Sequence, residues 1–316
     1  MKRKISVTRR NFIRTGVLGA AGYWAGCSNE LGARVLRGAV AESGRRIVKP
    51  KYTPTPQKWS DNEITAAWLG HSTVLVNFYG LNILTDPVLF RRVGVNLRLG
   101  TVGPKRLIAP ALAVNQLPPI DVILLSHAHM DHFDMTTLKC FPSSTHAVTA
   151  NATGDLLAGT RLKNATELGW GKEKTLHTRH GDLHVRAFQV NHWGARWRRD
   201  SYRGYNGYVL EREGRKIIFG GDTAWSDSFK TLHNRAPYEL AIMPIGAYKP
   251  WICSHCNPEQ AIRMADEAGA KYFLPIHHKT FALGREARHE PLQRVEATLE
   301  KGRLGWREVG ETFRVS

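Results

Sequence analysis

The chain has 316 residues, 42% of them hydrophobic and 9% aromatic, so it can bury a full core without needing a second domain. Its 45 lysines and arginines against 27 acidic residues give a formal charge of +18, which suits an anionic partner such as phospholipid, nucleic acid or a phosphorylated metabolite. Four cysteines exclude a scaffold built from disulfides, and they stand at Cys27, Cys140, Cys253 and Cys256.

The first 27 residues have the composition of an export signal. A basic segment without acids precedes the short apolar run Gly16 to Gly26, which is much shorter than the roughly 20 residues a spanning helix requires. Within it, Thr8-Arg9-Arg10-Asn11-Phe12-Ile13 resembles a twin-arginine signal. The run ending at Cys27 also resembles a lipoprotein signal, although Trp24 replaces the usual small aliphatic residue. We therefore expect an exported protein that is periplasmic or membrane-associated. The alternative is a basic N-terminus that carries no targeting signal.

Residues 28–60 are basic and proline-spaced and are expected to form an extended lead-in, with the globular domain at 61–316. The domain begins with short β-branched runs separated by glycine turns, which is the pattern of strands and hairpins. The expected strands are Ile64–Leu69, Thr73–Phe78, Leu81–Thr85, Val122–Leu125, Leu183–Val190, Gly207–Glu211, Lys216–Phe219, Leu240–Met243 and Tyr272–Pro275.

The clearest helix signal follows Asn257, which can cap a helix with Pro258 at its first position. Apolar residues then recur at helical spacing until Gly269, a residue typical of helix ends. Strand-rich halves with helices between and outside them predict an α/β architecture of stacked layers.

The main chemical signal is a cluster that follows the all-apolar strand Val122–Leu125. It reads His127-Ala128-His129-Met130-Asp131-His132. Three imidazoles and a carboxylate in six residues are costly to bury without a partner, and a divalent metal ion would satisfy them. Imidazole and carboxylate ligands suit zinc, and iron or manganese are also possible.

One short loop rarely completes a two-metal site, so further ligands should follow other strands. His192, Asp222 and His277 each stand at the end of an apolar stretch, where α/β sheets expose their sites. Each one alone would more often be a hydrogen-bonded histidine or a turn aspartate. Together with the cluster, the three are better interpreted as ligands.

This order of residues resembles the metallo-β-lactamase superfamily, which implies an αββα sandwich of two mixed β-sheets packed face to face with helices outside. Several blocks are similar to the N-acyl-phosphatidylethanolamine-hydrolysing phospholipase D family. They include Trp68-Leu69-Gly70-His71-Ser72-Thr73, Leu84-Thr85-Asp86-Pro87, Asn191-His192-Trp193, Gly221-Asp222-Thr223 and Thr280-Phe281-Ala282-Leu283.

The resemblance implies two zinc ions, one held by His127, His129 and His192 and the other by Asp131, His132 and His277. Asp222 would bridge both ions. Asp86 would orient a ligand imidazole, and His71 is interpreted as structural.

The implied activity is a zinc phosphodiesterase of phospholipase D type that acts on N-acyl-phosphatidylethanolamine-like lipids. Two cations sharing a water would supply hydroxide near neutral pH for in-line attack on phosphorus. The expected catalytic residues are Asp131, Asp222 and His255, with His255 helping the leaving group or contacting substrate. Cys253-Ser254-His255-Cys256 departs from the family's longer side chains here, which leaves the substrate open.

The segment Trp193–Tyr205 interleaves aromatic residues with arginines. Such a loop could lie on a phospholipid surface, because arginine pairs with phosphate and tryptophan favours interfaces. It could equally be a solvated loop with stacked pairs, or stack on nucleic-acid bases. The alternatives are therefore a nuclease or lactone hydrolase of the same fold, and a non-catalytic lipid- or metal-binding surface protein.

Overall fold

The computed structural model describes residues 42, 44–97, 100–197 and 199–315. The predicted export signal at 1–27, including Cys27, and the first part of the lead-in lie outside the described residues. The chain divides into two compact units, residues 1–46 with 92–105 and residues 47–91 with 106–316. The described strands of the smaller unit are β4 (Val95–Leu97) and β5 (Gly100–Val102), which pair in antiparallel fashion.

The larger unit contains two β-sheets. Within the described residues, one sheet has seven strands in the order β15-β1-β2-β3-β6-β7-β8 and the other has six in the order β14-β13-β12-β11-β10-β9. The strands of the first sheet are β1 (Ile64–Gly70), β2 (Thr73–Phe78), β3 (Leu81–Thr85), β6 (Val122–Leu125), β7 (His146–Ala150), β8 (Ala165–Leu168) and β15 (Thr312–Val315). Those of the second are β9 (Glu173–Thr178), β10 (Gly181–Phe188), β11 (Gly207–Arg212), β12 (Arg215–Phe219), β13 (Tyr238–Pro244) and β14 (Ala270–Ile276).

Both sheets are mixed. In the first, β15, β1, β2 and β3 pair in antiparallel fashion, and β3, β6, β7 and β8 are parallel. In the second, β9 to β12 are antiparallel, and β12, β13 and β14 are parallel. Strands β1, β2, β6 and β13 are buried at every position, because both of their faces are covered.

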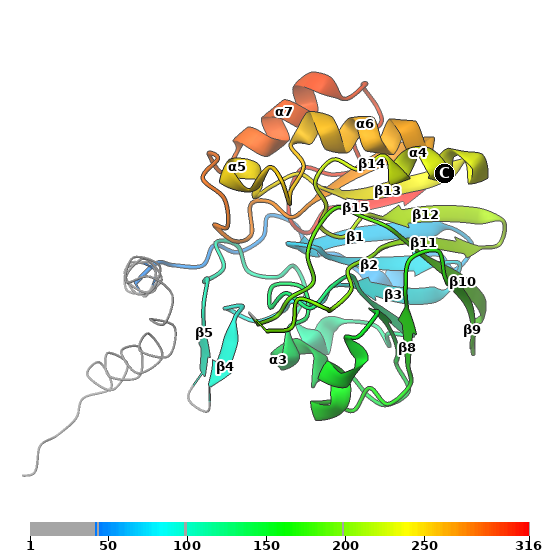
Figure 1. The fold of residues 1–316 in the computed structure, drawn as a ribbon, viewed down its shortest axis with the longest axis horizontal. Helices are drawn as coiled ribbons and strands as arrows, with labels where there is room; N and C mark the ends of the chain where they lie inside the picture. Colours follow the sequence, from blue (N-terminus) through cyan, green and yellow to red (C-terminus); the bar gives the residue numbers. More distant parts are fainter. Residues whose placement is uncertain (1–41, 43, 98–99, 198, 316) are drawn as a thin grey trace, which may run out of the picture. The chain divides into compact units, whose positions relative to one another are not determined.

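Two apolar cores hold the layers together. One contains inward side chains of both sheets, such as Trp68 and Ile123 from the first and Tyr208 and Phe219 from the second. The other lies between the outer face of the second sheet and its helices, and α6 contacts both β13 and β14. Figure 1 shows α4, α6 and α7 together over β12, β13 and β14, with α3 on the far side of the first sheet.

The helices of the larger unit are short. They are α3 (Met135–Leu138), α4 (Ser228–Leu232), α5 (Tyr248–Trp251), α6 (Pro258–Ala268) and α7 (Glu290–Thr298), with single 3₁₀ turns η1 (Pro56–Lys58), η2 (Val114–Gln116), η3 (Gly154–Gly159) and η4 (His233–Arg235). Among the described residues, none of these is long and apolar enough to cross a membrane.

The predicted αββα sandwich of two mixed sheets is confirmed. Every expected strand is present with boundaries shifted by at most two residues, and Thr73–Phe78, Leu81–Thr85 and Val122–Leu125 match as written. The predicted helix begins after Asn257, whose side chain accepts from the Gln260 backbone at 2.9 Å, and ends at Gly269 with φ 82°. In the predicted lead-in, Pro54, Pro56 and Trp59 are buried, and Trp59 belongs to the core between the sheets.

Candidate metal centre

The predicted site residues follow strands of both sheets. In the first sheet, Asp86 follows β3 and the cluster beginning at His127 follows β6. In the second, His192 follows β10, Asp222 follows β12 and His277 follows β14. The sandwich brings all of these side chains together at one site.

Three imidazoles form the first group. His127 Nε2 lies 2.8 Å from His129 Nδ1, and His192 Nε2 lies 3.2 Å from that same atom. The three rings meet edge to face, with centroids 4.4 to 5.0 Å apart. Burial lowers the pKa of His129 to about 4 and that of His192 to about 3, so these rings are neutral at pH 7 and offer lone pairs.

The second group contains Asp131, His132 and His277. Asp131 Oδ2 lies 3.6 Å from His132 Nε2 and 3.7 Å from His277 Nε2. The two imidazole rings are stacked with their planes 16° apart. Their donor atoms, together with a ring nitrogen of His71, all lie within 4.8 Å of one another.

Asp222 lies between the two groups. Its Oδ2 is 3.1 Å from both His132 Nε2 and His277 Nε2, and 3.9 Å from His192 Nε2. Burial alone would raise the pKa of Asp222, but His132 and His277 outweigh it and hold the pKa well below the usual range. The carboxylate is therefore ionised and central, which is the place predicted for a bridging ligand.

Asp86 orients imidazoles of both groups. Its Oδ2 accepts from His132 Nδ1 at 2.7 Å and from Ser126 Oγ at 2.6 Å, and Ser126 Oγ is 2.9 Å from His127 Nδ1. This fully buried carboxylate thus contacts one ring directly and another through a serine. Such partners fix the tautomer and direction of a ligand imidazole.

His192 is oriented in a different way, because its Nδ1 donates to the backbone oxygen of Ser254 at 2.8 Å. The sequence did not indicate Ser126 or Ser254 as parts of the site. A serine next to a histidine cluster is common, and a backbone carbonyl leaves no signature in the side-chain pattern.

The buried donor set fits a metal. Some nitrogen and oxygen atoms that face the centre are buried and have no well-aligned hydrogen bond to the described residues. Burying such atoms without a partner costs free energy. They are His129 Nε2, His132 Nε2, His277 Nε2 and Asp222 Oδ1. Imidazole nitrogens and carboxylate oxygens are ligands that divalent zinc, iron and manganese accept.

His255 also reaches the centre. Its Nδ1 is 3.8 Å from Asp222 Oδ2, and its ring lies 5.1 Å from that of His192. Burial lowers the pKa of His255 to about 4, so the ring is neutral near pH 7. The neighbouring Cys253 and Cys256 are free thiols, with Cys256 Sγ donating to the Pro244 backbone oxygen at 3.3 Å.

The basic aromatic loop after His192 is held by its own arginines. Arg196 donates to the backbone oxygens of Ala128, within the histidine cluster, and of Phe133, directly after it, at 3.0 and 2.8 Å. Arg203 pairs with Asp200 and Asp155. These two arginines of the loop therefore make contacts within the protein.

Large apolar side chains remain exposed around the centre, and we call them the aromatic rim. They are between 43% and 65% exposed and comprise Trp193, Trp197, Tyr202, Trp251 and Ile252. Trp193 contacts the ring of His129 edge-on at 5.0 Å. Trp251 lies in the turn that leads to His255, whose amide donates to the Trp251 backbone oxygen at 2.8 Å.

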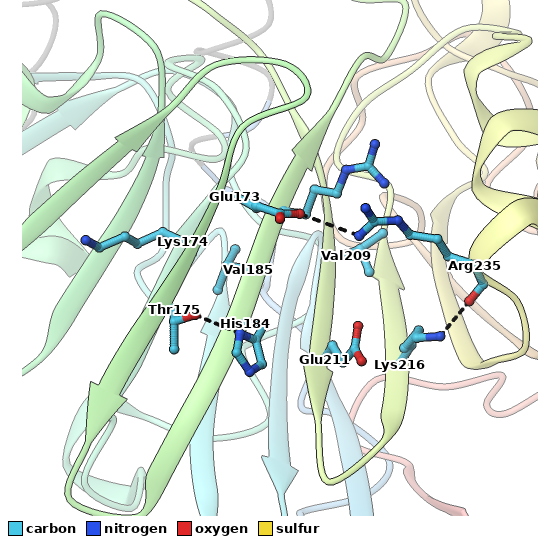
Figure 2. Close-up of a pocket in the computed structure, with 10 residues that line it drawn as sticks. Glu173, Lys174, Thr175, His184, Val185, Val209, Glu211, Lys216 and Arg235 are labelled. Carbon is cyan, nitrogen blue, oxygen red and sulfur yellow. Dashed lines mark hydrogen bonds and ion pairs between the residues drawn. The ribbon is translucent and has the colours of Figure 1, made fainter.

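A cavity away from the metal centre lies on the second sheet. It has a volume of about 290 Å³ on strands β9 to β12 beside η4, and Figure 2 shows its charged wall, where Glu173 pairs with Arg235 and His184 with Thr175. It includes no residue of the metal centre. A smaller cavity of about 80 Å³ adjoins His277 and is lined by apolar residues such as Phe281 and Leu283 and by Arg288.

Comparisons with known proteins agree with this geometry. The family model described as "Beta-lactamase superfamily domain" matches residues 81–278, which contain all seven predicted ligands. The N-acyl-phosphatidylethanolamine-hydrolyzing phospholipase D 1 of Caenorhabditis elegans is 30% identical over 239 residues, 71% of this chain and 66% of the relative. The mitochondrial enzyme of that name from Saccharomyces cerevisiae is 29% identical over 245 residues, 74% of this chain and 52% of the relative.

Among solved structures, a metallo hydrolase from Ignicoccus hospitalis is similar, with a TM-score of 0.59 and 19% sequence identity. The match covers 80% of this chain and 98% of that one. At this identity the likeness demonstrates the shared fold.

The two groups should take up metal with different pH dependence. Burial would lower the pKa of His277, but Asp222 and Asp131 outweigh it and raise the pKa to about 9, so metal must displace a proton there below that pH. The first group is neutral down to about pH 4 to 5. When the pH falls from 8 to 5.5, we expect chelator-treated protein to bind zinc at the first group with little change in affinity. The affinity of the second group should fall progressively over the same range.

Zinc titration with a competing chromophoric chelator at several pH values measures this difference. Equal pH dependence of both binding steps would contradict it.

Proposed function

Because this chain belongs to the metallo-β-lactamase superfamily and is a metal-dependent hydrolase of that fold, we propose that it is a phosphodiesterase of phospholipase D type acting on N-acyl-phosphatidylethanolamine-like phospholipids. The observation that carries the proposal is the pair of donor groups joined by Asp222, together with the exposed aromatic rim near them. A phospholipid presents an anionic diester and apolar chains at the same time, and this arrangement offers partners for both.

The two phospholipase D relatives support the choice of substrate class. Their names assign them hydrolysis of N-acyl-phosphatidylethanolamine, and each matches about seven-tenths of this chain. The superfamily model matches residues 81–278, which contain the whole donor set. We therefore extend the phosphodiester substrate to this chain as a proposal.

In the proposed site, His127, His129 and His192 hold one divalent cation, Asp131, His132 and His277 hold the other, and Asp222 contacts both. When bound, two such ions activate a water molecule and neutralise charge on the phosphoryl oxygens. Zinc suits the donor set, and iron or manganese would also be accepted. Asp131 and Asp222 are ionised at neutral pH, because neighbouring histidines hold the pKa of each well below the usual range against the opposing effect of burial.

His255 supplies a neutral imidazole at the edge of the centre. With a pKa of about 4, the ring is neutral at pH 7, so one of its nitrogens can donate an N–H and the other can accept a hydrogen bond. We assign it contact with the substrate phosphate or the leaving alcohol. Its backbone is fixed by the α5 turn, since its amide donates to the Trp251 oxygen.

The rim provides the lipid contact. Tryptophan and tyrosine are favoured where apolar and aqueous regions meet, and the loop that carries Trp193 and Trp197 is fixed by Arg196 rather than free to fold away. Exposed Arg199, Arg285 and Arg288 add positive charge around the site. Export to the periplasm or to a membrane surface is part of the same proposal, and it rests on the basic N-terminal sequence.

A substrate panel tests the proposed function. We expect the zinc-loaded protein to release N-acylethanolamine from N-acyl-phosphatidylethanolamine, and Asp222→Ala to lose at least about a hundredfold in rate through loss of the shared ligand. Mass spectrometry of the lipid products measures the reaction. Turnover of an oligonucleotide or a lactone instead would identify the alternative hydrolases, and absence of turnover on all three with metal bound would favour a non-catalytic surface protein.

His255→Ala tests the assigned helper. We expect kcat to fall by about 10²-fold or more, as for loss of an acid–base or hydrogen-bonding group, with zinc content unchanged. Retained turnover at unchanged metal content would remove the assignment. Loss of one zinc ion would place His255 among the ligands instead.

Vesicle binding tests the rim. Replacing Trp197 and Trp251 together with serine should weaken binding to anionic phospholipid vesicles by about tenfold or more, which corresponds to losing about 1.4 kcal/mol or more of apolar burial. Tyr52→Ser, an exposed aromatic outside the rim at 41% exposure, should bind as the wild type does. Sedimentation with sucrose-loaded vesicles measures both, and equal losses in the two variants would contradict the assignment.

A further inference from the structure

His71 lies in the turn between β1 and β2, and its side chain is buried against the second donor group. Its Nε2 is 3.0 Å from Asp131 Oδ2. The ring lies 4.3 Å from that of His277 and meets Phe281 edge-on at 5.1 Å. The side chain is 1% exposed, so this contact is shielded from bulk water.

Three of the other proposed ligands have an identified orienting partner. His132 contacts Asp86, His127 contacts Ser126, and His192 contacts the Ser254 backbone. For Asp131, whose side chain is 20% exposed, the shortest polar contact among the described residues is the one with His71. The ligand imidazoles of its own group are 3.6 and 3.7 Å from the same oxygen.

The backbone of His71, in the turn between β1 and β2 of the first sheet, contacts His277, which follows β14 of the second sheet. Its carbonyl oxygen accepts from the His277 amide at 3.1 Å and from Trp68 Nε1 at 2.8 Å, and its own amide donates to Thr280 Oγ1 at 2.7 Å. His71 has φ 55°, a left-handed conformation that costs free energy for a residue with a side chain. These three hydrogen bonds hold the residue in that conformation.

We propose that His71 is a positioning residue that sets the affinity of the second metal position. Its Nε2–H donates to Asp131 and directs that carboxylate, while its backbone oxygen sets the place of His277. The inference rests on the metal centre of the proposed function, and it is independent of the substrate. It also replaces the purely structural role expected for His71 from the sequence.

A matched pair of variants separates the hydrogen bond from packing. His71→Leu removes the donor, and His71→Gln keeps an N–H near the place of Nε2, while both bear the same left-handed backbone cost. We expect His71→Leu to keep one zinc ion and to bind the second about 10- to 100-fold more weakly, the range for loss of an orienting partner, with His71→Gln restoring most of the affinity. Chelator competition and metal analysis measure this without any substrate.

Two zinc ions bound by His71→Leu with wild-type affinity would overturn the proposal, as would equal losses in both variants. If His71→Leu does not fold, as shown by circular dichroism, Thr280→Val and Thr280→Ser form a second pair. The valine removes the acceptor for the His71 amide and should weaken the second zinc ion alone, whereas the serine should not. Unchanged zinc binding in Thr280→Val would overturn the proposal. A failed lipid assay with these zinc results intact would reject the substrate and not the role of His71.

Discussion

Burying a dense set of imidazoles and carboxylates is the constraint on which this structure depends. Groups such as His127, His132 and Asp222 lose their hydration at the end of the sandwich, and the neighbouring core cannot hydrogen-bond to them. Part of the cost is offset by contacts among themselves and with Asp86. His129 Nε2, His132 Nε2, His277 Nε2 and Asp222 Oδ1 keep no well-aligned partner, and a cation shared by these donors would meet the remaining cost.

The fold meets this constraint by making each layer contribute part of the centre. The parallel portion of the first sheet presents Asp86 and the cluster after β6, and the parallel portion of the second presents Asp222 and His277. The apolar core between the sheets fixes the spacing of these ends. A shift of one layer against the other would separate Asp222 from His132, so packing far from the chemistry maintains the 3.1 Å contact.

The sequence could predict the elements and ligands whose signal is local. The strand Val122–Leu125 is apolar at every position because both of its faces are buried, and the ligand histidines follow strands whose ends must meet. Orientation was not predictable in the same way. The sequence left open whether the arginines of the loop Trp193–Tyr205 face a lipid surface or solvent, and Arg196 instead binds the backbone oxygens of Ala128 and Phe133. Ser254 contributes only a carbonyl, and the burial of Trp59 depends on where the segment before β1 packs.

Charge provides a last argument about the substrate. The centre contains the carboxylates of Asp86, Asp131 and Asp222, while the imidazoles of its first group are neutral. Two divalent cations would exceed these three negative charges by one, and the hydroxide formed from the activated water would balance that excess. Under the proposed function, exposed Arg285 and Arg288 would therefore have to meet the negative charge of the substrate, while the rim would contact its apolar chains.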